Sequence, residues 1–276
     1  MSRANAVSLK KPRNNLGVIM LIGAVVVALF AAAYYLYTVQ YRPSGRWARF
    51  TELRTNPATF ARYAIQPGAR CGDAPFAFPT RGVILGLWDQ SYHIGHRHTG
   101  LDIFSGTEPG LTPIYAAYPG YLTRLPEWLS TVIVRIPSDP LRPGRQIWTY
   151  YTHLADVNGN SFISEDFPPG TYEVPVEAGT FLGFMGNFSG NPSNPTGLHL
   201  HFSIVKDDGE GGFLNELNLR NTYDPSPYFG LRLNHRENPD EIPVCEGETT
   251  IDAWRLVNEG ISDPSSLLSN SLGTGF

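Results

Sequence analysis

The sequence is poor in charge, and its charges show no basic excess. Lysine, arginine, aspartate and glutamate make up 17% of the 276 residues, and the formal net charge is −4. Proteins that bind nucleic acid carry clusters of basic residues that neutralise phosphates. The composition therefore argues against nucleic acid as a partner.

Cysteine is also scarce, and the common motifs for a serine nucleophile and for phosphate binding are absent. Only Cys71 and Cys245 are present, and neither has the partner of a CxxC zinc motif. The chain contains no GxSxG nucleophile elbow and no glycine-rich nucleotide loop. In an extracytoplasmic protein the two cysteines could form one disulfide, and two unrelated thiols are the alternative.

One long hydrophobic run lies near the start of the chain. Residues Leu16 to Tyr37 include no charged residue, and a helix needs about 20 apolar residues to cross a bilayer. Signal sequences have a shorter apolar region of roughly 7–15 residues. We therefore expect residues 16–38 to form a single transmembrane helix in the cell membrane, although the small residues Ala31–Ala33 leave cleavage open.

Short runs of β-branched and aromatic residues follow, separated by turns rich in Gly, Pro, Asn and Asp. No repeat and no long amphipathic helix interrupts them. This pattern predicts an all-β domain, an antiparallel β-sheet or sandwich-like structure, behind the single N-terminal helix. The candidate strands are Gly82–Trp88, Leu101–Ser105, Pro113–Ala117, Thr131–Ile136, Gln146–Leu154, Phe181–Gly186 and His199–Val205.

These patterns divide the chain into five parts. Within the linker, Asn56 and Pro57 are typical of a helix start, and we expect a short helix through Tyr63. We expect the last part to be partly disordered, from Ser265 to Phe276. The expected parts are a cytoplasmic tail (1–15), the transmembrane helix (16–38), a stalk or linker (39–81), the β domain (82–233) and a C-terminal tail (234–276).

Histidine carries the strongest chemical signal. His98 is followed four residues later by Asp102, and His199 and His201 are separated by one residue. Alternate residues of a strand share a face and lie about 7 Å apart, so these two imidazoles should point the same way. His153, in another candidate strand, supplies a further imidazole.

Such residues suit a catalytic zinc site. That kind of site requires three protein ligands and one open position for water. Two histidines and a carboxylate meet the requirement, and the metal lowers the pKa of bound water towards neutrality. Additional imidazoles can transfer protons. Each motif alone is weak, because single histidines are usually structural or exposed, but the combination in this order is much rarer.

The segments around these histidines resemble the signatures of the lysostaphin/LytM-type zinc peptidases. The stretch His98–Leu122 is similar to the first signature, in which His, three residues and Asp precede a Gly-Thr-Pro-Ala-Gly pattern. Tyr150–Leu154 resembles the family's Tyr-x-His-Leu strand, and Val176–Phe202 resembles a glycine-rich run that ends in His-Leu-His-Phe. Asp224–Phe229 is similar to the close of the domain. The resemblance covers residues 82–233.

The resemblance implies a membrane-anchored zinc metalloendopeptidase that hydrolyses peptide cross-links of bacterial peptidoglycan. Carried over by position, it implies the zinc ligands His98, Asp102 and His201 and the catalytic residues His153 and His199. Peptidoglycan peptides are then the partner, and the domain is expected outside the cytoplasm. Which bond is cut, and whether a regulatory protein partner exists, stay open.

Two departures from the family pattern affect substrate choice. The segment 156–175 is longer than the usual link, and an EPGLT insertion separates Thr107 from Pro113. Both are expected to form loops at the rim of the substrate groove.

One alternative function is a tethered, inactive domain that binds cell wall or regulates another hydrolase, although such relatives typically lack one or more of the five zinc-binding and catalytic residues. Another is a zinc carboxypeptidase that trims D-alanine, against which the HLHF signature argues.

The remaining histidines carry less information. His93 and His96 precede His98, and residues in such positions are usually exposed rather than metal ligands. His235 lies beyond the expected domain and is expected to be inert.

Topology gives the first test. Basic residues lie on both sides of the hydrophobic run, so the positive-inside rule does not orient it. We place the N-terminus in the cytoplasm because the implied substrate lies outside. A reporter that is active only in the cytoplasm should be silent when fused after Phe276, and one that is active only outside should report there. The reverse pattern would overturn this orientation.

Overall fold

The computed structural model describes residues 15–40, 45–93 and 95–245. Contacts divide the chain into two compact units, one of residues 1–42 with 93–95 and one of residues 43–92 with 96–276. The expected disorder from Ser265 to Phe276 lies outside the described residues.

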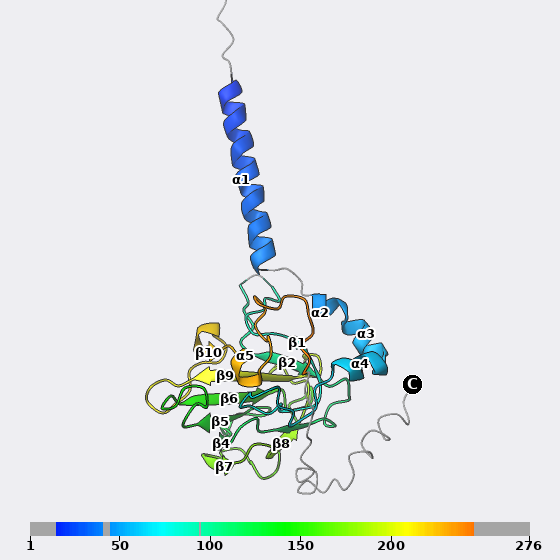
Figure 1. The fold of residues 1–276 in the computed structure, drawn as a ribbon, viewed down its shortest axis with the longest axis vertical. Coiled ribbons are helices and arrows are strands. Elements are labelled where there is room, and N and C mark those ends of the chain that lie inside the picture. The colour runs from blue at the N-terminus through cyan, green and yellow to red at the C-terminus, as the bar shows by residue number, and fades with distance from the viewer. Residues whose placement is uncertain (1–14, 41–44, 94, 246–276) are drawn as a thin grey trace, which may run out of the picture. The chain divides into compact units, whose positions relative to one another are not determined.

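The first unit contains the expected helix. Helix α1 covers Leu16–Gln40 (Figure 1), and its stretch Leu16–Tyr37 is long and apolar enough to cross a membrane. An unbroken run of apolar residues, with no proline, favours this helix. Length and composition suit either a membrane span or a signal sequence.

Three short helices open the second unit: α2 (Gly45–Ala48), α3 (Phe50–Thr55) and α4 (Pro57–Tyr63). The predicted start of α4 is confirmed. The Asn56 side chain accepts hydrogen bonds from the backbone N–H of Ala58 (3.1 Å) and Thr59 (3.2 Å). These bonds satisfy two of the free N–H groups of the first turn, and Pro57 needs no partner there.

The rest of the unit is β structure, and every pairing between named strands is antiparallel, as predicted. The main sheet has the strand order β1-β2-β9-β6-β5-β4-β7, with β10 paired to β9, and a second sheet pairs β3 with β8 (Figure 1). The strands are β1 (Val83–Gly86), β2 (Leu101–Phe104), β3 (Pro113–Tyr115), β4 (Gly120–Thr123), β5 (Val132–Ile136), β6 (Ile147–Thr152), β7 (Val174–Val176), β8 (Phe181–Phe184), β9 (Leu200–Lys206) and β10 (Thr222–Tyr223). A 3₁₀ turn, η1 (Leu219–Asn221), and helix α5 (Ser226–Phe229) lie near the end of the fold.

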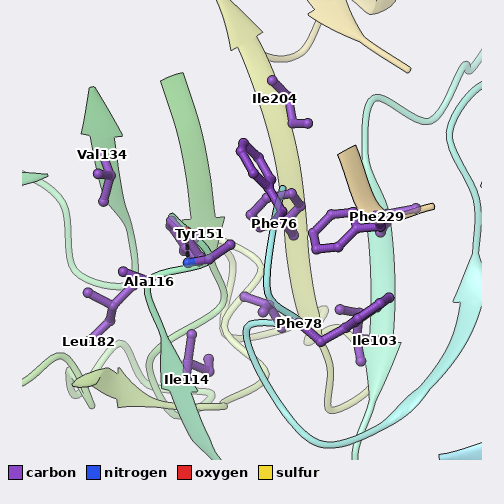
Figure 2. Packing of buried hydrophobic residues seen from close by; sticks show 14 of the residues in the cluster. Phe76, Phe78, Ile103, Ile114, Ala116, Val134, Tyr151, Leu182, Ile204 and Phe229 are labelled. Atoms are coloured by element: carbon purple, nitrogen blue, oxygen red, sulfur yellow. Dashed lines mark hydrogen bonds between the residues drawn. The ribbon is translucent and has the colours of Figure 1, made fainter. Parts of the chain in front are cut away.

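The hydrophobic core includes residues from outside the expected domain. Phe76 and Phe78, which the sequence indicated as linker, are buried. Their rings lie 5.7 Å and 4.7 Å from the ring of Phe229, between strands of the main sheet and α5 (Figure 2). Residues of the expected linker therefore belong to the core of the β domain.

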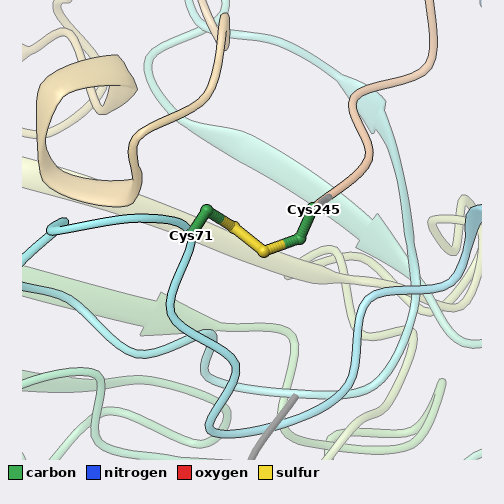
Figure 3. Close-up of a disulfide and its surroundings, with 2 residues drawn as sticks. All are labelled: Cys71 and Cys245. Carbon is green, nitrogen blue, oxygen red and sulfur yellow. A yellow bond between two sulfur atoms is a disulfide. The ribbon is translucent and has the colours of Figure 1, made fainter. Parts of the chain in front are cut away.

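The C-terminal segment also differs from the expected tail as far as residue 245. Ile242 is buried in a cluster with residues of α3, β1 and β2. Cys71 and Cys245 form a disulfide, with a Cα–Cα distance of 5.5 Å (Figure 3). Of the two alternatives that the sequence left open, the structure therefore shows the disulfide and not two separate thiols. The disulfide ties the segment that precedes β1 to the segment that follows the sheet.

The disulfide should contribute to stability mainly by restricting the unfolded chain. Its cysteines are 174 residues apart in sequence, and closing long loops typically stabilises by about 2–4 kcal/mol. We expect Cys71→Ser to lower the free energy of unfolding by about that amount, measured by urea titration with tryptophan fluorescence. As a control, reductant should destabilise the wild type and leave the Cys71→Ser/Cys245→Ser protein unchanged. Equal stability of the wild type and both variants would contradict this account.

Candidate metal centre

Two neighbouring strands bring three of the expected site residues together. Asp102 of β2 pairs directly with His201 of β9, and His98 lies just before β2. His98 Nε2, Asp102 Oδ1 and His201 Nδ1 form a triangle in which each pair of atoms is 3.0 Å apart. All three residues are buried. They form the one group of potential metal ligands of this kind among the described residues.

The outer hydrogen bonds of the two imidazoles determine which nitrogens face the triangle. His98 Nδ1 lies 2.9 Å from the carbonyl oxygen of Leu87, which can only accept, so this nitrogen donates its proton. His201 Nε2 lies 2.9 Å from Oε1 of Glu216 and donates to that carboxylate. When neither ring carries a second proton, both histidines therefore turn a nitrogen with a free lone pair towards Asp102.

Three lone pairs that converge in a buried site require a positive charge between them. Burial lowers the pKa of His201, but the charge of Glu216 and hydrogen bonds to Glu216 and Asp102 outweigh it and raise that pKa to about 10. For Asp102 the effects have the opposite sign: burial raises its pKa, but the charges of His98 and His199 outweigh burial and hold the pKa well below its usual range. A proton on His201 or a metal ion can supply the positive charge.

The donor set fits a divalent transition metal. Zinc takes imidazole nitrogen and carboxylate oxygen at about 2.0–2.2 Å in a tetrahedral arrangement, which separates neighbouring donors by about 3.3 Å. The 3.0 Å edges of the triangle are close to this value. Three protein donors also leave a fourth position for water or substrate, as catalytic zinc sites do.

Glu216 is a site residue that the sequence analysis missed. It lies in the loop between β9 and η1, is buried, and accepts a second hydrogen bond from Thr99 Oγ1 at 2.5 Å. Burial raises the pKa of Glu216, but the charge of His201 and its hydrogen bond lower it to about 2. Carboxylates that bond the outer nitrogen of a metal-binding histidine orient the ring and increase its basicity. No motif in the sequence marks this residue, since only the fold brings it to His201.

Tyr92 is a second residue at the site that the sequence analysis missed, and it contacts Asp102. Its hydroxyl donates to Oδ2 of Asp102 at 2.7 Å, which leaves Oδ1 for the triangle. Gly86 of β1 makes room for this bond, because a Cβ there would collide with both Asp102 Oδ2 and the Tyr92 hydroxyl. A side chain at position 86 would therefore displace the carboxylate.

His153 and His199 lie beside the triangle, each adjacent to a strand rather than within one. The sequence predicted that both lie inside strands. Instead, His199 lies one residue before the start of β9, and His153 lies one residue after the end of β6. His199 Nδ1 donates to the carbonyl of Gly197 and His153 Nδ1 to that of Phe188, both at 2.6 Å. In each ring the second nitrogen, Nε2, is left for other contacts. The His199 Nε2 lies 3.4 Å from Asp102 Oδ1.

The backbone of His153 is in an unusual conformation. Its φ is +74°, a left-handed value that costs energy for a residue with a side chain and recurs at functional sites. The conformation brings the His153 ring centroid to 4.6 Å from that of His199 and 6.3 Å from that of His201. Burial, followed by the charges of those two histidines, lowers the pKa of His153 to about 3. The neutral imidazole is therefore the stable form.

The other histidines lie outside the triangle. His93 is exposed, as expected, and belongs to the first unit. His96 is half-buried rather than exposed, with its ring centroid 5.2 Å from that of Tyr92. His235 is half-buried, and burial together with the charge of Arg46 lowers its pKa to about 4.

Comparisons with known proteins add little beyond this geometry. No protein-family model and no curated protein matches the chain. A solved structure from Ruminococcus gnavus that carries the name glycyl-glycine endopeptidase lytM is 22% identical, with a TM-score of 0.31, over 53% of this chain and 50% of that one. The chain thus spans about half the length of that protein.

A second similar structure is a mutant form of the catalytic domain of the prophage-encoded M23 protein EnpA from Enterococcus faecalis. It is 21% identical, with a TM-score of 0.33, over 54% of this chain and 95% of that one. The assignment of the site depends on its own residues.

The position of Glu216 predicts a measurable effect on metal affinity. Loss of such an outer partner typically weakens metal binding about 10–100-fold. We expect Glu216→Gln to weaken zinc binding to that extent, measured by competition with a chromogenic chelator, because the neutral amide no longer attracts the His201 proton. Glu210→Gln, on the exposed part of the same loop, is the matched control and should bind zinc as the wild type does. Unchanged affinity in Glu216→Gln would refute this role.

Proposed function

We propose that the chain is a zinc metalloendopeptidase, anchored in the cell membrane with its β domain outside, that hydrolyses peptide cross-links of bacterial peptidoglycan. The observation that carries the proposal is the pairing of the buried triangle of His98, Asp102 and His201 with two further imidazoles at its edge. A purely structural metal site needs no further imidazoles beside it. The resemblance of the motifs to lysostaphin/LytM-type peptidases supports the same function.

His98, Asp102 and His201 would hold the zinc ion. When bound, zinc supplies Lewis-acid activation of water and of the scissile carbonyl. His199 is suited to accept a proton at Nε2, because its Nδ1 is occupied by the Gly197 carbonyl. His153, held neutral by burial, can hydrogen-bond at Nε2 with the reacting groups.

The proposal separates two histidines that lie two residues apart. His201→Ala should lose both zinc and stability, because metal binding is linked to folding. His199→Ala should retain zinc and the fold, while its rate of cell-wall hydrolysis falls about 10²–10⁴-fold, the typical cost of losing an acid–base group. Metal analysis and mass spectrometry of fragments released from purified cell wall measure the two effects.

His235→Ala provides a matched control, since it replaces a half-buried imidazole outside the site, and it should hydrolyse cell wall normally. If the zinc-loaded wild type releases no fragments, the peptidase function is wrong and the tethered-domain alternative is favoured. Hydrolysis by His199→Ala at the wild-type rate would remove His199 from the mechanism. Full zinc occupancy in His201→Ala would refute the ligand assignment.

A further inference from the structure

The turn at residues 87–90 is strained and holds His98 in place. Asp89 in this turn has a φ of +64°, a left-handed value that persists only where the surrounding structure maintains it. The Leu87 carbonyl accepts from His98 Nδ1 at 2.9 Å. On the backbone, the Asp89 N–H donates to the His98 carbonyl at 2.8 Å, and the His98 N–H donates to the Gln90 carbonyl at 2.7 Å. A shift of the turn would therefore move a proposed metal ligand.

Residues 230–245, which we name the C-terminal strap, bond directly to this turn. The Trp88 N–H donates to the carbonyl of Leu233 at 3.1 Å, and the Trp88 carbonyl accepts from the backbone N–H of His235 at 2.9 Å. Both backbone groups of this turn residue are thus satisfied by the strap. If the strap moved away, both groups would need new partners, and leaving such groups buried without partners is costly.

The strap also supplies a charge to the turn. The Asp89 side chain is only 3% exposed. One of its carboxylate oxygens accepts from Arg97 and the other from Arg236 of the strap. Removing one partner of a buried charge is destabilising, because the charge has already lost its water. Arg236 therefore helps to hold Asp89 in its left-handed conformation from outside the loop.

Helix α2 connects the strap and the turn a third time. Arg46 Nη1 donates to the Asn238 carbonyl at 2.7 Å, and its Nη2 donates to the Gln90 side chain at 2.9 Å. The backbone N–H of Gly45 donates to Oδ1 of Asp240 at 3.0 Å. One buried guanidinium thus bonds to the strap and to the turn at the same time.

Both ends of the strap meet the segment around Cys71. At its start, a Cβ on Gly230 would lie 2.4 Å from the carbonyl oxygen of Cys71, so the two backbones are in direct contact. At its end, the disulfide joins Cys245 to Cys71 (Figure 3). A segment outside the sheet orders only at a cost in conformational entropy, and a cross-link at its far end lowers that cost. The disulfide therefore closes the strap over the turn.

We propose that the C-terminal strap positions the metal centre, and that the Cys71–Cys245 disulfide, by closing the strap, raises the affinity of the site for zinc. The strap acts through the turn at residues 87–90. The inference rests on the metal site of the proposed function and not on the peptidase reaction. Pairing of the cysteines joins the two sulfurs and passes two electrons and two protons to a disulfide-bearing oxidant, which becomes a dithiol. Compartments outside the cytoplasm supply such oxidants.

Zinc affinity of the full-length chain in detergent, measured by competition with a chromogenic chelator, tests the strap. The Cys71→Ser/Cys245→Ser variant should bind zinc about tenfold or more weakly than the wild type, as happens when an outer contact of a metal-binding histidine is lost. Serine at both positions leaves no thiol that could bind zinc itself.

A second variant leaves the disulfide intact. The Arg236 side chain is 71% exposed, so the fold should tolerate Arg236→Gln, which is expected to weaken zinc binding about fivefold. Arg236→Lys keeps the charge and should restore most of the affinity. Arg232→Gln is the matched control, because this exposed arginine of the strap pairs with Glu241 and not with the turn. It should bind zinc as the wild type does.

Loss of stability alone is a different effect, and Val134→Ala controls for it. Val134 is buried on β5, which β6 and β9 separate from β2, so this variant should unfold more easily and bind zinc normally. Hydrogen exchange of the metal-free proteins, followed by mass spectrometry, locates the change. Residues 87–92 should exchange faster in Cys71→Ser/Cys245→Ser and in Arg236→Gln, and at the wild-type rate in Arg232→Gln.

Equal zinc affinity in the wild type and a folded Cys71→Ser/Cys245→Ser protein would overturn the proposal. If circular dichroism shows that this variant does not fold, equal affinity in Arg236→Gln and Arg232→Gln overturns it instead. A wild type that binds no zinc would refute both the strap and the proposed function. A wild type whose zinc affinity depends on the strap as expected, but which releases no fragments from cell wall, would support the strap and refute the peptidase function.

Discussion

The antiparallel register of β2 and β9 is the constraint on which the candidate site depends. It places Asp102 opposite His201 and makes both point away from the main core, into which Ile103 and Leu200 project. Because side chains alternate along a strand, a slip of one residue would turn the carboxylate into the core and an apolar side chain into the site. The burial of the apolar residues therefore also maintains the geometry of the metal donors.

Hydrogen bonds from outside the triangle then fix which nitrogen each imidazole turns inward. The carbonyls of Leu87, Gly197 and Phe188 and the carboxylate of Glu216 each occupy the outer nitrogen of one histidine. Four imidazoles in a small buried volume would otherwise repel one another when protonated. With the outer nitrogens occupied, the inner nitrogens are available to a metal and to reacting groups.

Segments that precede β1 and segments that follow the sheet in sequence both support the loop between β1 and β2, which leads to the site. Arg46 of α2 is fully buried and donates hydrogen bonds to the carbonyls of Leu85 and Asn238 and to the side chain of Gln90. Gln90 also accepts from the backbone of Leu87, whose carbonyl holds His98. A guanidinium is suited to this position because its fixed fork of donors can satisfy several acceptors at once. The short helices, the C-terminal segment and the metal centre are thereby connected through one buried side chain.

Local patterns in the sequence were sufficient for the all-β class, the apolar helix, the Asn56 cap and the grouping of histidines, because alternation, apolar length and capping are properties of neighbouring residues. They could not identify Glu216 or Tyr92, assign Phe76 and Phe78 to the core, or place His153 in a left-handed conformation. Each of these depends on contacts between residues distant in sequence or on a backbone angle that the surrounding packing imposes. The sequence by itself determined which side chains could bind a metal. Only the tertiary structure decided which nitrogen each histidine presents, because the hydrogen-bond partner that holds the other nitrogen comes from a separate loop.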